Sequence, residues 1–489
     1  MELHELTELT PSREQDAPIY LQLYRRYLDV IAAGKLRPGE RVPSVRSLAS
    51  ELNLARGTVE LAYQMLTSEG YFTARGAAGT FISPRLESLG EPGPATAPPP
   101  PATAANTAPR SAPAVATPRP FQLGLPALDA FPRKTWSRLA ARNARVMDTA
   151  ALIYPDITGY DPLRRAIATY LGISRGIACT HEQVFVTAGH LGTLEMVCRT
   201  LLSPGDTGWY EDPGYLFAWH FLERAGMRLA PVPVDEEGLD VAAGLKHAGN
   251  ARFAVVTPTH QSPTGVTLSL PRRLQLLEWA SQRDAWIVED DYDSEFRYHG
   301  RPLPALKSLD RDDRVLYTGT FSKVLFPGLR LAYLVVPASQ IDRFRDAARH
   351  LPGPGSILLQ ATVADFMAQG HFARHLRKMR ALYGERRGFL VDALSHVFDD
   401  TLGVAPQAGG IHALASLPRG RNDKALVAAA QQHGLAVQAV SNWQMSAVSG
   451  TSRARLPTRS GLLLGFTNIT GRDVAMQLCG QLLAATRGV

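Results

Sequence analysis

Cysteine is scarce in this chain of 489 residues, which contains only Cys179, Cys198 and Cys479. Three scattered cysteines cannot build a disulfide framework or a four-cysteine metal site. No apolar run reaches the roughly 18–20 residues that cross a bilayer, and the acidic, polar tail at residues 1–16 differs from a secretory signal. These absences exclude disulfide-stapled, zinc-finger and membrane proteins, and we expect a cytoplasmic protein without a metal site.

Lysine is also scarce, because only seven of the 52 basic residues are lysine and the rest are arginine. A lysine that lies within a chemical motif is therefore less often a chance match. Hydrophobic residues make up 45% of the chain, enough for most of it to bury a core. The net charge of +7 permits a polyanionic partner without requiring one.

A change in composition divides the chain. Residues 91–120 contain ten prolines and nine alanines, a composition that forms no core and favours an extended, polyproline-type linker. An ordered surface loop packed on the rest of the protein is the alternative. We therefore expect an acidic tail at 1–16, a small unit at 17–84, a linker at 85–120 and a large body at 121–489.

The small unit carries two short helical patterns joined by a tight turn. Ser44 is a candidate N-cap for a helix whose apolar residues fall at helical spacing over 45–52. A turn at 53–55 leads to a second apolar stripe over 59–66, and the glycine-rich stretch 70–82 reads as two short strands around a tip. This order predicts an α+β winged helix-turn-helix.

This stretch resembles the winged helix-turn-helix domain of the GntR family of bacterial repressors over almost all of residues 17–83. The matching segments are Pro18–Gln22, Gly34–Gly39, Pro43–Arg46, Arg56–Val59, Ala62-Tyr63, Glu69-Gly70 and Gly79–Phe81. The resemblance implies that the partner is operator DNA. The residues that it implies as DNA contacts are Ser44, Arg46, Arg56, Gly57, Thr58, Arg75 and Gly76.

Elementary chemistry agrees with these DNA contacts. Arg56 lies at the start of the expected recognition helix, and an arginine that pairs with guanine through two hydrogen bonds gives about 1–3 kcal/mol of discrimination. The alternative for each arginine is a solvated surface charge. One departure from the family is Ala55, which stands where a polar residue usually precedes the recognition arginine and leaves a helix cap in doubt.

The body alternates short apolar strands with helical stretches. This order predicts an α/β fold with a largely parallel sheet covered on both faces, and ligands that collect at the carboxyl ends of its strands. The expected strands are Val184–Thr187, Thr207–Tyr210, Phe253–Thr257, Trp286–Glu289, Val315–Thr318 and Leu331–Val336.

Residues with cofactor-binding chemistry follow these strands. Lys323 and Arg330 follow the fifth strand, Asp290 to Tyr292 follow the fourth, and Gly189-His190 open a helix after the first. Such a set suits pyridoxal 5′-phosphate (PLP), because a lysine forms a Schiff base with its aldehyde and an acid keeps its pyridine nitrogen protonated. Arginine, hydroxyl groups and a helix N-terminus suit its phosphate.

The body resembles the fold type I PLP-dependent aminotransferases, and its combination with the small unit resembles the MocR subfamily of GntR regulators. The resemblance covers most of residues 121–480. The matching segments are Thr158–Arg164, Thr257–Gln261, Glu289–Tyr298, Gly300–Leu306 and Gly319–Pro327.

By this resemblance, Lys323 carries PLP as an internal aldimine, Asp290 faces the pyridine nitrogen and Tyr292 donates to the ring hydroxyl. Asp291 is the alternative acid, and spacing to Lys323 and Tyr292 favours Asp290. His190 is implied as a helix-start residue rather than a catalyst. The other implied cofactor contacts are Tyr215 against the ring, Ser262 beside the ring hydroxyl, and Gly189, His190, Leu191, Thr320, Ser322 and Arg330 around the phosphate.

Two departures weaken the resemblance to a working enzyme. Ser262 stands where these aminotransferases place an asparagine that touches the ring hydroxyl. The stretch Gly461–Phe466 lacks the arginine that clamps a substrate carboxylate, although Arg453, Arg455 and Arg459 lie just before it. Without such a clamp an α-amino acid loses a charge-assisted anchor of about 1.5–3 kcal/mol.

The sequence therefore predicts a homodimeric, PLP-binding transcription regulator that senses PLP or an amine or amino-acid effector. One alternative is a working aminotransferase with an accessory DNA-binding domain. Another is a sensor of PLP alone that controls vitamin B6 synthesis. The basic stretch His371–Gly388 adds a smaller question, because it is either a solvated helix face or an auxiliary DNA contact.

Overall fold

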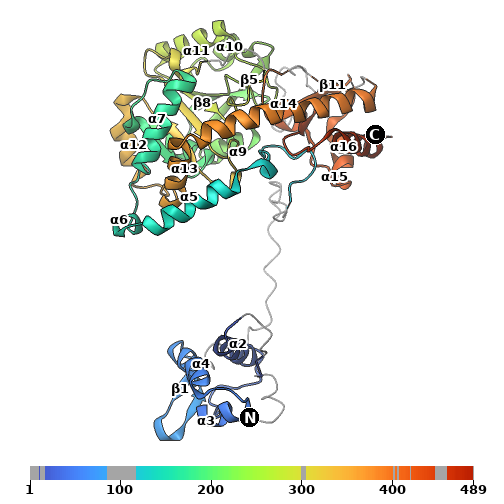
Figure 1. The fold of residues 1–489 in the computed structure, drawn as a ribbon. Helices are drawn as coiled ribbons and strands as arrows, with labels where there is room; N and C mark the ends of the chain where they lie inside the picture. Colours follow the sequence, from blue (N-terminus) through green and yellow to red (C-terminus); the bar gives the residue numbers. More distant parts are fainter. Residues whose placement is uncertain are drawn as a thin grey trace. The chain divides into compact units, whose positions relative to one another are not determined.

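The structure is a computed structural model that describes residues 10–11, 17–84, 117–298, 304–399, 402–404, 407–418, 420–445 and 460–487. The chain divides into two compact units, residues 1–111 and 112–489, and each is described here by itself (Figure 1). Most of the acidic tail and residues 85–116 of the linker lie outside the described residues, so the boundaries expected for them remain predictions.

The first unit is a winged helix-turn-helix, as the sequence predicts. The two strands pair in antiparallel fashion, with Phe72 opposite Ile82 and Ala74 opposite Thr80. Its elements are α2 (Ile19–Ala32), α3 (Val45–Glu51), α4 (Arg56–Ser68), β1 (Phe72–Ala74) and β2 (Thr80–Ile82).

Three aromatic rings hold this unit together. Tyr27 of α2, Tyr63 of α4 and Phe72 of β1 pack edge to face, with ring centroids 5.1–5.7 Å apart. The two buried tyrosine hydroxyls lie 3.0 Å apart, and Tyr63 donates to the Pro43 carbonyl at 2.9 Å. Since Pro43 directly precedes α3, this bond sets where the helix-turn-helix begins, and the Ser44 hydroxyl caps α3 by accepting from the Ser47 N–H at 3.1 Å.

The body is built on an eight-stranded mixed sheet in the order β3-β10-β9-β8-β7-β4-β5-β6. Its strands from β5 through β4, β7 and β8 to β9 are parallel, whereas β10 runs antiparallel to both β3 and β9. The strands are β3 (Val184–Thr187), β4 (Thr207–Asp212), β5 (Arg228–Asp235), β6 (Gly238–Leu239), β7 (Phe253–Val256), β8 (Trp286–Asp291), β9 (Val315–Thr320) and β10 (Ala332–Val335).

Two expectations about these strands were wrong. The sequence placed Asp290 and Thr320 after their strands, yet both lie within them, because β8 and β9 continue to pair with each other through Asp291 and Gly319. Strand β5 was not expected at all. It contains Pro231 and Pro233, which are typical of strand ends and edges, and it is followed by only the two-residue β6 on its outer side.

Helices cover both faces of the sheet, as Figure 1 shows. Val255, Val288 and Leu316 pack with α8 (His190–Leu201), α9 (Leu216–Arg224) and α12 (Ile341–Ala348) on one face. Ala254 and Ile287, one residue away, pack with α10 (Val241–Ala248) and α11 (Leu270–Arg283) on the other. A sheet that is buried on both faces leaves only its strand ends open to a ligand.

A second, four-stranded antiparallel sheet follows in the chain, in the order β11-β12-β14-β13. It packs in one continuous core with α5 (Arg133–Val146), α7 (Asp161–Arg175), α13 (Ile357–Ala368), α14 (His371–Phe398), α15 (Asp423–Gln432) and α16 (Arg472–Thr486). The strands of this small sheet are β11 (Gly403–Val404), β12 (His412–Ser416), β13 (Gln438–Ala439) and β14 (Gly461–Gly465).

The segment Phe121–Ala127, which leads into the body, is fixed to this small sheet and its neighbours. The Phe121 carbonyl accepts from Gly465 of β14 at 2.9 Å, and the Ala127 N–H donates to the Tyr383 hydroxyl at 2.9 Å. We call Phe121–Ala127 the leading segment. The body therefore begins with ordered structure directly after the expected linker.

The basic stretch of α14 is in part a structural feature. Arg386 is buried and pairs with Asp129 at 2.5 Å, and Arg380 donates to the Glu295 carbonyl at 2.7 Å.

Within the described residues, no helix is both long enough and apolar enough to cross a membrane.

The N-terminus of α4 generates a stability prediction. Ala55 has the extended backbone of an N-cap (φ −65°, ψ 137°) but offers no side chain to the free N–H groups of the helix. Ala55→Ser supplies a hydroxyl acceptor, which stabilises a helix start by about 0.5–2 kcal/mol. We expect hydrogen–deuterium exchange of residues 54–68 in the full-length chain to slow by about two- to thirtyfold, the change that 0.5–2 kcal/mol gives.

Ala77→Ser is the matched control, because Ala77 is an exposed alanine of the same unit in the wing turn Gly76–Ala78, away from α4. Equal exchange rates in the wild type and Ala55→Ser would contradict the missing cap.

Candidate functional site

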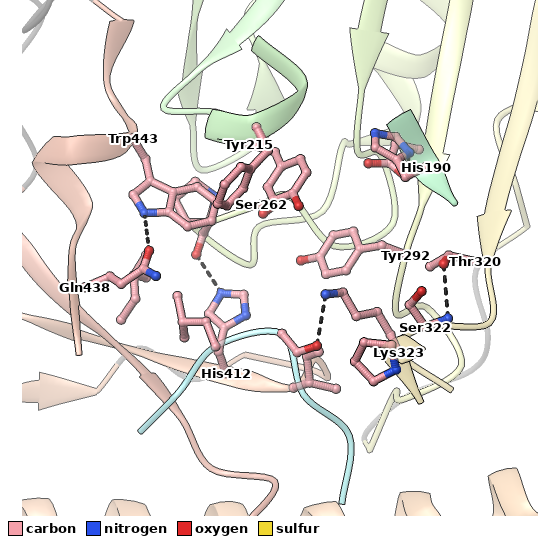
Figure 2. Close-up of a pocket in the computed structure, with 18 of the residues that line it drawn as sticks. His190, Tyr215, Ser262, Tyr292, Thr320, Ser322, Lys323, His412, Gln438 and Trp443 are labelled. Atoms are coloured by element: carbon pink, nitrogen blue, oxygen red, sulfur yellow. Dashed lines mark hydrogen bonds and ion pairs between the residues drawn. The ribbon is translucent and has the colours of Figure 1, made fainter. Parts of the chain in front are cut away.

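A cavity of about 380 Å³ lies where the ends of the large sheet's strands face the small sheet and the leading segment. Figure 2 shows Lys323, Tyr292, Thr320 and Ser322 at one end of it, and Trp443 and Gln438 at the other, with Tyr215 beside Trp443. The residues that line it are Leu123, Gly124, His190, Leu191, Tyr215, Phe217, Ser262, Pro263, Asp290, Tyr292, Thr320, Ser322, Lys323, Pro327, Arg330, Ile411, His412, Gln438, Trp443 and Leu463.

Lys323 lies just beyond β9, and its ammonium group donates to the Gly124 carbonyl of the leading segment at 3.0 Å. A Cβ on Gly124 would lie 2.7 Å from Nζ, so only glycine admits this contact. Burial lowers the pKa of Lys323 below its usual value, while the Asp293 and Asp290 carboxylates act in the opposite direction. The lowered pKa increases the share of neutral amine, which is the nucleophilic form.

The two neighbouring acids of β8 face opposite ways. Asp290 lines the cavity, where Oδ1 lies 3.5 Å from His190 Nδ1 and accepts from the Thr318 hydroxyl at 3.3 Å. Asp291 instead pairs with Arg175 at 3.1 Å and accepts from the Tyr317 hydroxyl at 2.6 Å. Burial raises the pKa of Asp290, and His190 acts in the opposite direction. A cation placed in the cavity would further stabilise its charged form.

An anion site forms at the N-terminus of α8. Gly189 is the N-cap residue, with φ 88°, a left-handed conformation that glycine adopts without strain. A Cβ on Gly189 would lie 3.2 Å from the Arg330 guanidinium, so this arginine lies directly against the helix start. The N–H groups of His190 and Leu191 belong to the first turn, where backbone donors lack partners within the helix.

The hydroxyls of Thr320 and Ser322 complete this end of the cavity. The Thr320 hydroxyl accepts from the Ser322 N–H at 3.1 Å, which fixes the turn that leads from β9 to Lys323. Donors from three separate segments, at Gly189–Leu191, Thr320–Ser322 and Arg330, therefore meet in one place. Such a set of donors suits a phosphate dianion.

Tyr215 and Tyr292 contribute the aromatic part of the wall. Tyr215 is the N-cap residue of α9, and its ring lies 6.1 Å from that of His190 and 5.9 Å from that of Trp443, measured between centroids. Burial raises the pKa of Tyr292 well above its usual value and that of Tyr215 to about 12, so both phenols stay protonated and can donate. The Ser262 hydroxyl opposes this rise in the pKa of Tyr292.

Sequence reasoning missed the far wall of the cavity. His412 of β12, Gln438 of β13 and Leu463 of β14 come from the small sheet, and Trp443 donates to Gln438 through its indole N–H at 3.1 Å. Gln438 lies in a strand of only two residues, so no strand pattern marked it in the sequence. Trp443 and Leu463 also pack together in an apolar cluster, which makes much of this wall hydrophobic.

The expected carboxylate clamp is not among the described lining residues, where Arg330 is the one arginine. Arg453, Arg455 and Arg459 lie outside the described residues. Leu463, from the stretch compared with the clamp region, lines the cavity instead.

A buried carboxylate supports the loop that carries Ser262. Glu211 accepts from the Thr257 N–H at 3.1 Å, the Thr257 hydroxyl at 2.6 Å and the Gln261 side chain at 3.0 Å. Gln261 in turn accepts from the Thr264 hydroxyl at 2.6 Å. These bonds fix the loop 257–264 against β4. Burial raises the pKa of Glu211 to about 7 despite them.

A second buried lysine lies apart from the cavity. Lys307 donates to the Val315 carbonyl at 2.6 Å and lies 4.0 Å from Asp310, and burial lowers its pKa. Its bonds are internal to the sheet, which distinguishes it from the amine of Lys323.

In the first unit, the expected DNA contacts lie on exposed surface. Arg46 of α3 and Arg56 at the start of α4 are exposed, as are Gly57 and Arg75. The Arg75 guanidinium lies 5.0 Å from the centre of the Phe81 ring. The remaining expected contacts are Ser44, which also caps α3, Thr58 in the first turn of α4, and Gly76 in the wing turn.

The cavity residues fit PLP in three ways. A buried lysine amine faces the cavity, a buried acid lies opposite, and His190 Nε2 is buried without a hydrogen-bond partner among the described residues. The close approach of Arg330 to Gly189 leaves a glycine-lined anion site. Within the described parts of the chain, no group of three His, Cys, Asp or Glu side chains is placed to hold a metal ion.

Two family models match the chain. The model of aminotransferase class I and II matches residues 128–458, and the model of bacterial regulatory proteins of the gntR family matches residues 19–82. The first spans most of the body and the second spans nearly all of the described small unit.

Curated relatives share both parts. The chain is 37% identical over 478 residues to a probable rhizopine catabolism regulatory protein, MocR, of Rhizobium meliloti, covering 94% of this chain and 92% of the relative. It is 35% identical to the pyridoxine biosynthesis transcriptional regulator PdxR of Corynebacterium glutamicum, covering 80% and 82%. It is 36% identical to the transcriptional regulator TauR of Rhodobacter capsulatus, covering 78% and 79%.

Solved structures match the body. The kynurenine aminotransferase of Pyrococcus horikoshii, in complex with PMP, has a TM-score of 0.67 at 27% identity and covers 76% of this chain and 91% of its own. The α-aminoadipate aminotransferase LysN of Thermus thermophilus, complexed with N-(5′-phosphopyridoxyl)-L-leucine, has a TM-score of 0.66 at 28% identity and covers 75% and 92%.

Glu211 generates a pH prediction. An acid whose pKa is about 7 when folded and about 4.5 when unfolded binds more protons in the folded state, so the free energy of unfolding falls as pH rises between these values. Glu211→Gln removes this titration. We expect urea unfolding of the body, followed by tryptophan fluorescence at pH 5, 6 and 7, to lose stability less steeply in the variant.

Glu223→Gln is the control, because Glu223 is exposed on α9, and it should keep the wild-type slope. A wild-type slope in Glu211→Gln as well would show that Glu211 titrates normally in the folded protein.

Proposed function

Because the chain belongs to the MocR-type transcriptional regulators, which join a gntR-family domain to an aminotransferase class I and II body, we propose that it couples chemistry at Lys323 to operator binding. The chain is a DNA-binding regulator and PLP is its cofactor. The proposal adds the residues, the effector class and the route of coupling.

The roles of the cavity residues are supported by their geometry. Gly189–Leu191, Thr320, Ser322 and Arg330 would hold the phosphate. Asp290 would face the pyridine nitrogen, because a buried carboxylate with a raised pKa gains most from a cationic partner. The bound cofactor supplies an aldehyde carbon that takes up an amine.

The hydroxyl of Tyr292 and the ring of Tyr215 would contact the two remaining features of the cofactor. Tyr292 is protonated and beside Ser262, so it can donate to the ring oxygen. Tyr215 lies in the cavity wall between His190 and Trp443, where it can stack on the ring. Ser262 stands where the similar aminotransferases have an asparagine, and its hydroxyl is shorter than that amide. Tyr292 is therefore the main donor to the ring oxygen of the cofactor.

One observation carries the coupling: the Lys323 amine is hydrogen-bonded to Gly124 of the leading segment. A bound aldehyde would engage this nitrogen, which could then no longer donate as a free ammonium group. The Gly124 carbonyl would then lose its partner. The leading segment lies at the N-terminal side of the body, so this loss acts on the part of the chain that follows the expected linker.

The effector that we propose is an amine or amino acid, or PLP itself. A primary amine that took the place of the Lys323 nitrogen on the cofactor would return the lysine to its free form. This exchange restores the donor to Gly124. An effector that binds the two states with different affinity shifts the population between them.

We propose a homodimer as the functional unit. Four large apolar side chains, Val146, Leu152, Ile153 and Tyr154, are exposed close together in sequence at the end of α5 and just after it, with exposed fractions of 64–98%. A cluster of this kind is typical of a protein interface. A two-fold symmetric dimer would match paired half-sites in the operator.

A working aminotransferase is the less favoured alternative. The relative that is 37% identical is a probable regulatory protein. The match covers 92% of that relative's length and includes the DNA-binding unit. Among the described lining residues, the only arginine lies at the anion site beside Gly189, which leaves none at the wall formed by Leu463.

Fluorescence-anisotropy titration against the intergenic DNA upstream of the gene tests the proposal. We expect saturable, competitor-resistant binding whose affinity changes on addition of PLP. Lys323→Ala removes the nucleophile, so this variant should bind the same DNA without responding to PLP, and borohydride should trap no cofactor on it.

Specific binding that ignores PLP in the wild type would shift the effector to an amine. A PLP response that survives in Lys323→Ala would exclude the lysine from the coupling. Steady turnover of an amino donor and a keto acid, without specific DNA binding, would favour the enzyme instead.

The recognition helix gives a separate prediction. Arg56→Ala should weaken operator binding by about 1–3 kcal/mol and barely change binding to nonspecific DNA, because a base contact is lost rather than a phosphate contact. Arg25→Ala on α2, also an exposed arginine, is the control for charge alone. Equal losses on both DNAs would make Arg56 a phosphate contact.

A further inference from the structure

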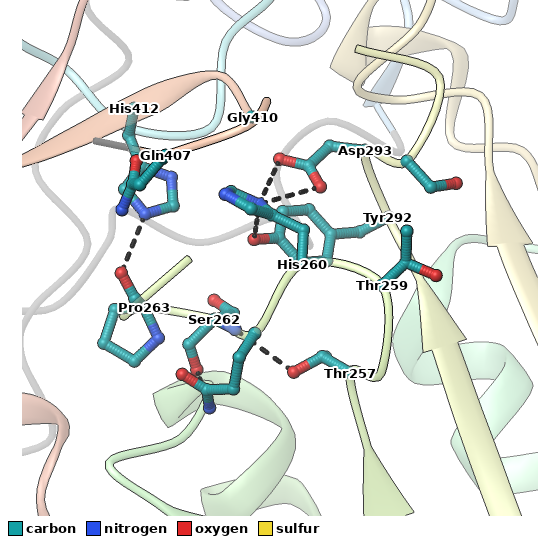
Figure 3. A network of polar contacts seen from close by, with 12 residues as sticks. Thr257, Thr259, His260, Ser262, Pro263, Tyr292, Asp293, Gln407, Gly410 and His412 are labelled. Carbon is teal, nitrogen blue, oxygen red and sulfur yellow. Dashed lines mark hydrogen bonds and ion pairs between the residues drawn. The ribbon is translucent and has the colours of Figure 1, made fainter. Parts of the chain in front are cut away.

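A polar network lies behind Tyr292, outside the set of residues so far given a role. His260 Nδ1 lies 3.0 Å from the Tyr292 hydroxyl and 3.1 Å from both carboxylate oxygens of Asp293 (Figure 3). His260 and Asp293 are buried, with exposed fractions of 7% and 1%. They come from different segments, since His260 precedes Ser262 in the loop after β7, and Asp293 follows Tyr292 after β8.

The direction of these hydrogen bonds follows from donor and acceptor capacity. A carboxylate accepts and does not donate, so the nitrogen that lies between both Asp293 oxygens carries a proton. A protonated Nδ1 cannot accept from Tyr292. The tyrosine oxygen therefore accepts a share of the same N–H, and its own proton must point to another acceptor.

The second ring nitrogen agrees with this assignment. His260 Nε2 is buried and has no partner among the described residues. A Cβ on Gly410 would lie 2.6 Å from Nε2 and 2.2 Å from Cε1, so the ring lies directly against that glycine. An N–H there would be a buried donor without an acceptor, which is costlier than a lone pair, and the neutral Nδ1–H form is favoured.

The remaining neighbours of Tyr292 leave the cavity as the one direction for its hydroxyl proton. The Ser262 hydroxyl opposes the rise in the pKa of Tyr292, which is the direction expected of a hydroxyl that presents its hydrogen to the phenol oxygen. His412, whose ring centroid is 5.7 Å from that of His260, donates through Nε2 to the Pro263 carbonyl at 3.0 Å, and burial lowers its pKa to about 4. It is therefore neutral near pH 7 and adds no charge to the network.

The carboxylates that act on Tyr292 and Lys323 complete the electrostatic surroundings. Asp293, Asp290 and Glu211 each raise the pKa of Tyr292 and so favour the protonated phenol. Asp293 and Asp290 also oppose the lowering of the Lys323 pKa by burial. With His260 donating to its oxygen, Tyr292 directs its own proton into the cavity that it lines.

We propose that His260, oriented by Asp293, is a positioning residue that makes Tyr292 a donor to the ring oxygen of the cofactor and so sets the charge state of the Lys323–cofactor linkage. This inference rests on the proposed role of Lys323. The hydrogen bond that Tyr292 donates stabilises negative charge on the ring oxygen. Without this bond, the oxygen holds more tightly the proton that it shares with the Lys323 nitrogen. Loss of the network therefore raises the pH at which the linkage loses its proton.

A pair of amide variants tests the position of the donor. His260→Asn places an N–H where Nδ1 lies, and His260→Gln places one where Nε2 lies. In a pH titration of the visible absorbance of PLP-loaded protein, we expect His260→Gln to raise the midpoint by about one unit, a tenfold change in proton affinity. His260→Asn should keep the midpoint within a few tenths of the wild-type value.

A double variant shows whether His260 acts through Tyr292. Tyr292→Phe alone should raise the midpoint, and adding His260→Gln to it should shift the midpoint little further, because the two changes interrupt the same chain of bonds. Full additivity would overturn the proposal, as would an unchanged midpoint in His260→Gln. Should His260→Gln fail to fold, as judged by near-ultraviolet circular dichroism, His260→Leu takes its place against His260→Asn.

Failure of this inference is distinct from failure of the proposed function. Wild-type protein that takes up no borohydride-trappable PLP would overturn both. Trappable PLP with midpoints that do not separate His260→Asn from His260→Gln would leave Lys323 in its role and remove His260 from it.

Discussion

Burial of the Lys323 amine is the constraint on which the rest of the site depends. A lysine whose charge is poorly solvated has a lowered pKa, and the cavity tunes that effect with two carboxylates rather than one. Burial of the amine requires β8 and β9 to end side by side. It also requires the leading segment to close over them with a glycine at position 124. The same closure gives the amine its partner, so the leading segment contacts the reactive nitrogen directly.

Much of this arrangement could be predicted from the sequence where chemistry and pattern coincide. The strands that lead to Gly189 and Lys323, and the strand that contains Asp290, are apolar runs with polar ends, and the strand order of a parallel sheet brings such ends together. Ser44 was predicted as a cap from its position alone, and its hydroxyl does cap α3. The family resemblance added the roles of individual side chains, which spacing cannot assign.

The parts that escaped prediction share a physical reason. His412 and Gln438 lie in strands whose residues carry no signal of being near Lys323, because tertiary packing rather than local pattern brings them there. The His260 network was hidden in the same way, since its members lie 32 and 33 positions apart in the chain. Strand β5 was obscured by its two prolines, which local propensity counts against a strand.

The scarcity of lysine acquires a meaning beside the buried amine. An aldehyde condenses with any accessible primary amine, whereas guanidinium groups stay protonated and do not compete. This chain carries its positive charge mostly on arginine, and its other buried lysine, Lys307, is tied to Val315 inside the sheet. The positive charge that suits DNA is thus carried mostly by groups that do not react with an aldehyde. The chain offers few lysine amines for unspecific modification. A protein built in this way can stay in contact with a reactive aldehyde while only one of its nitrogens, that of Lys323, responds to it.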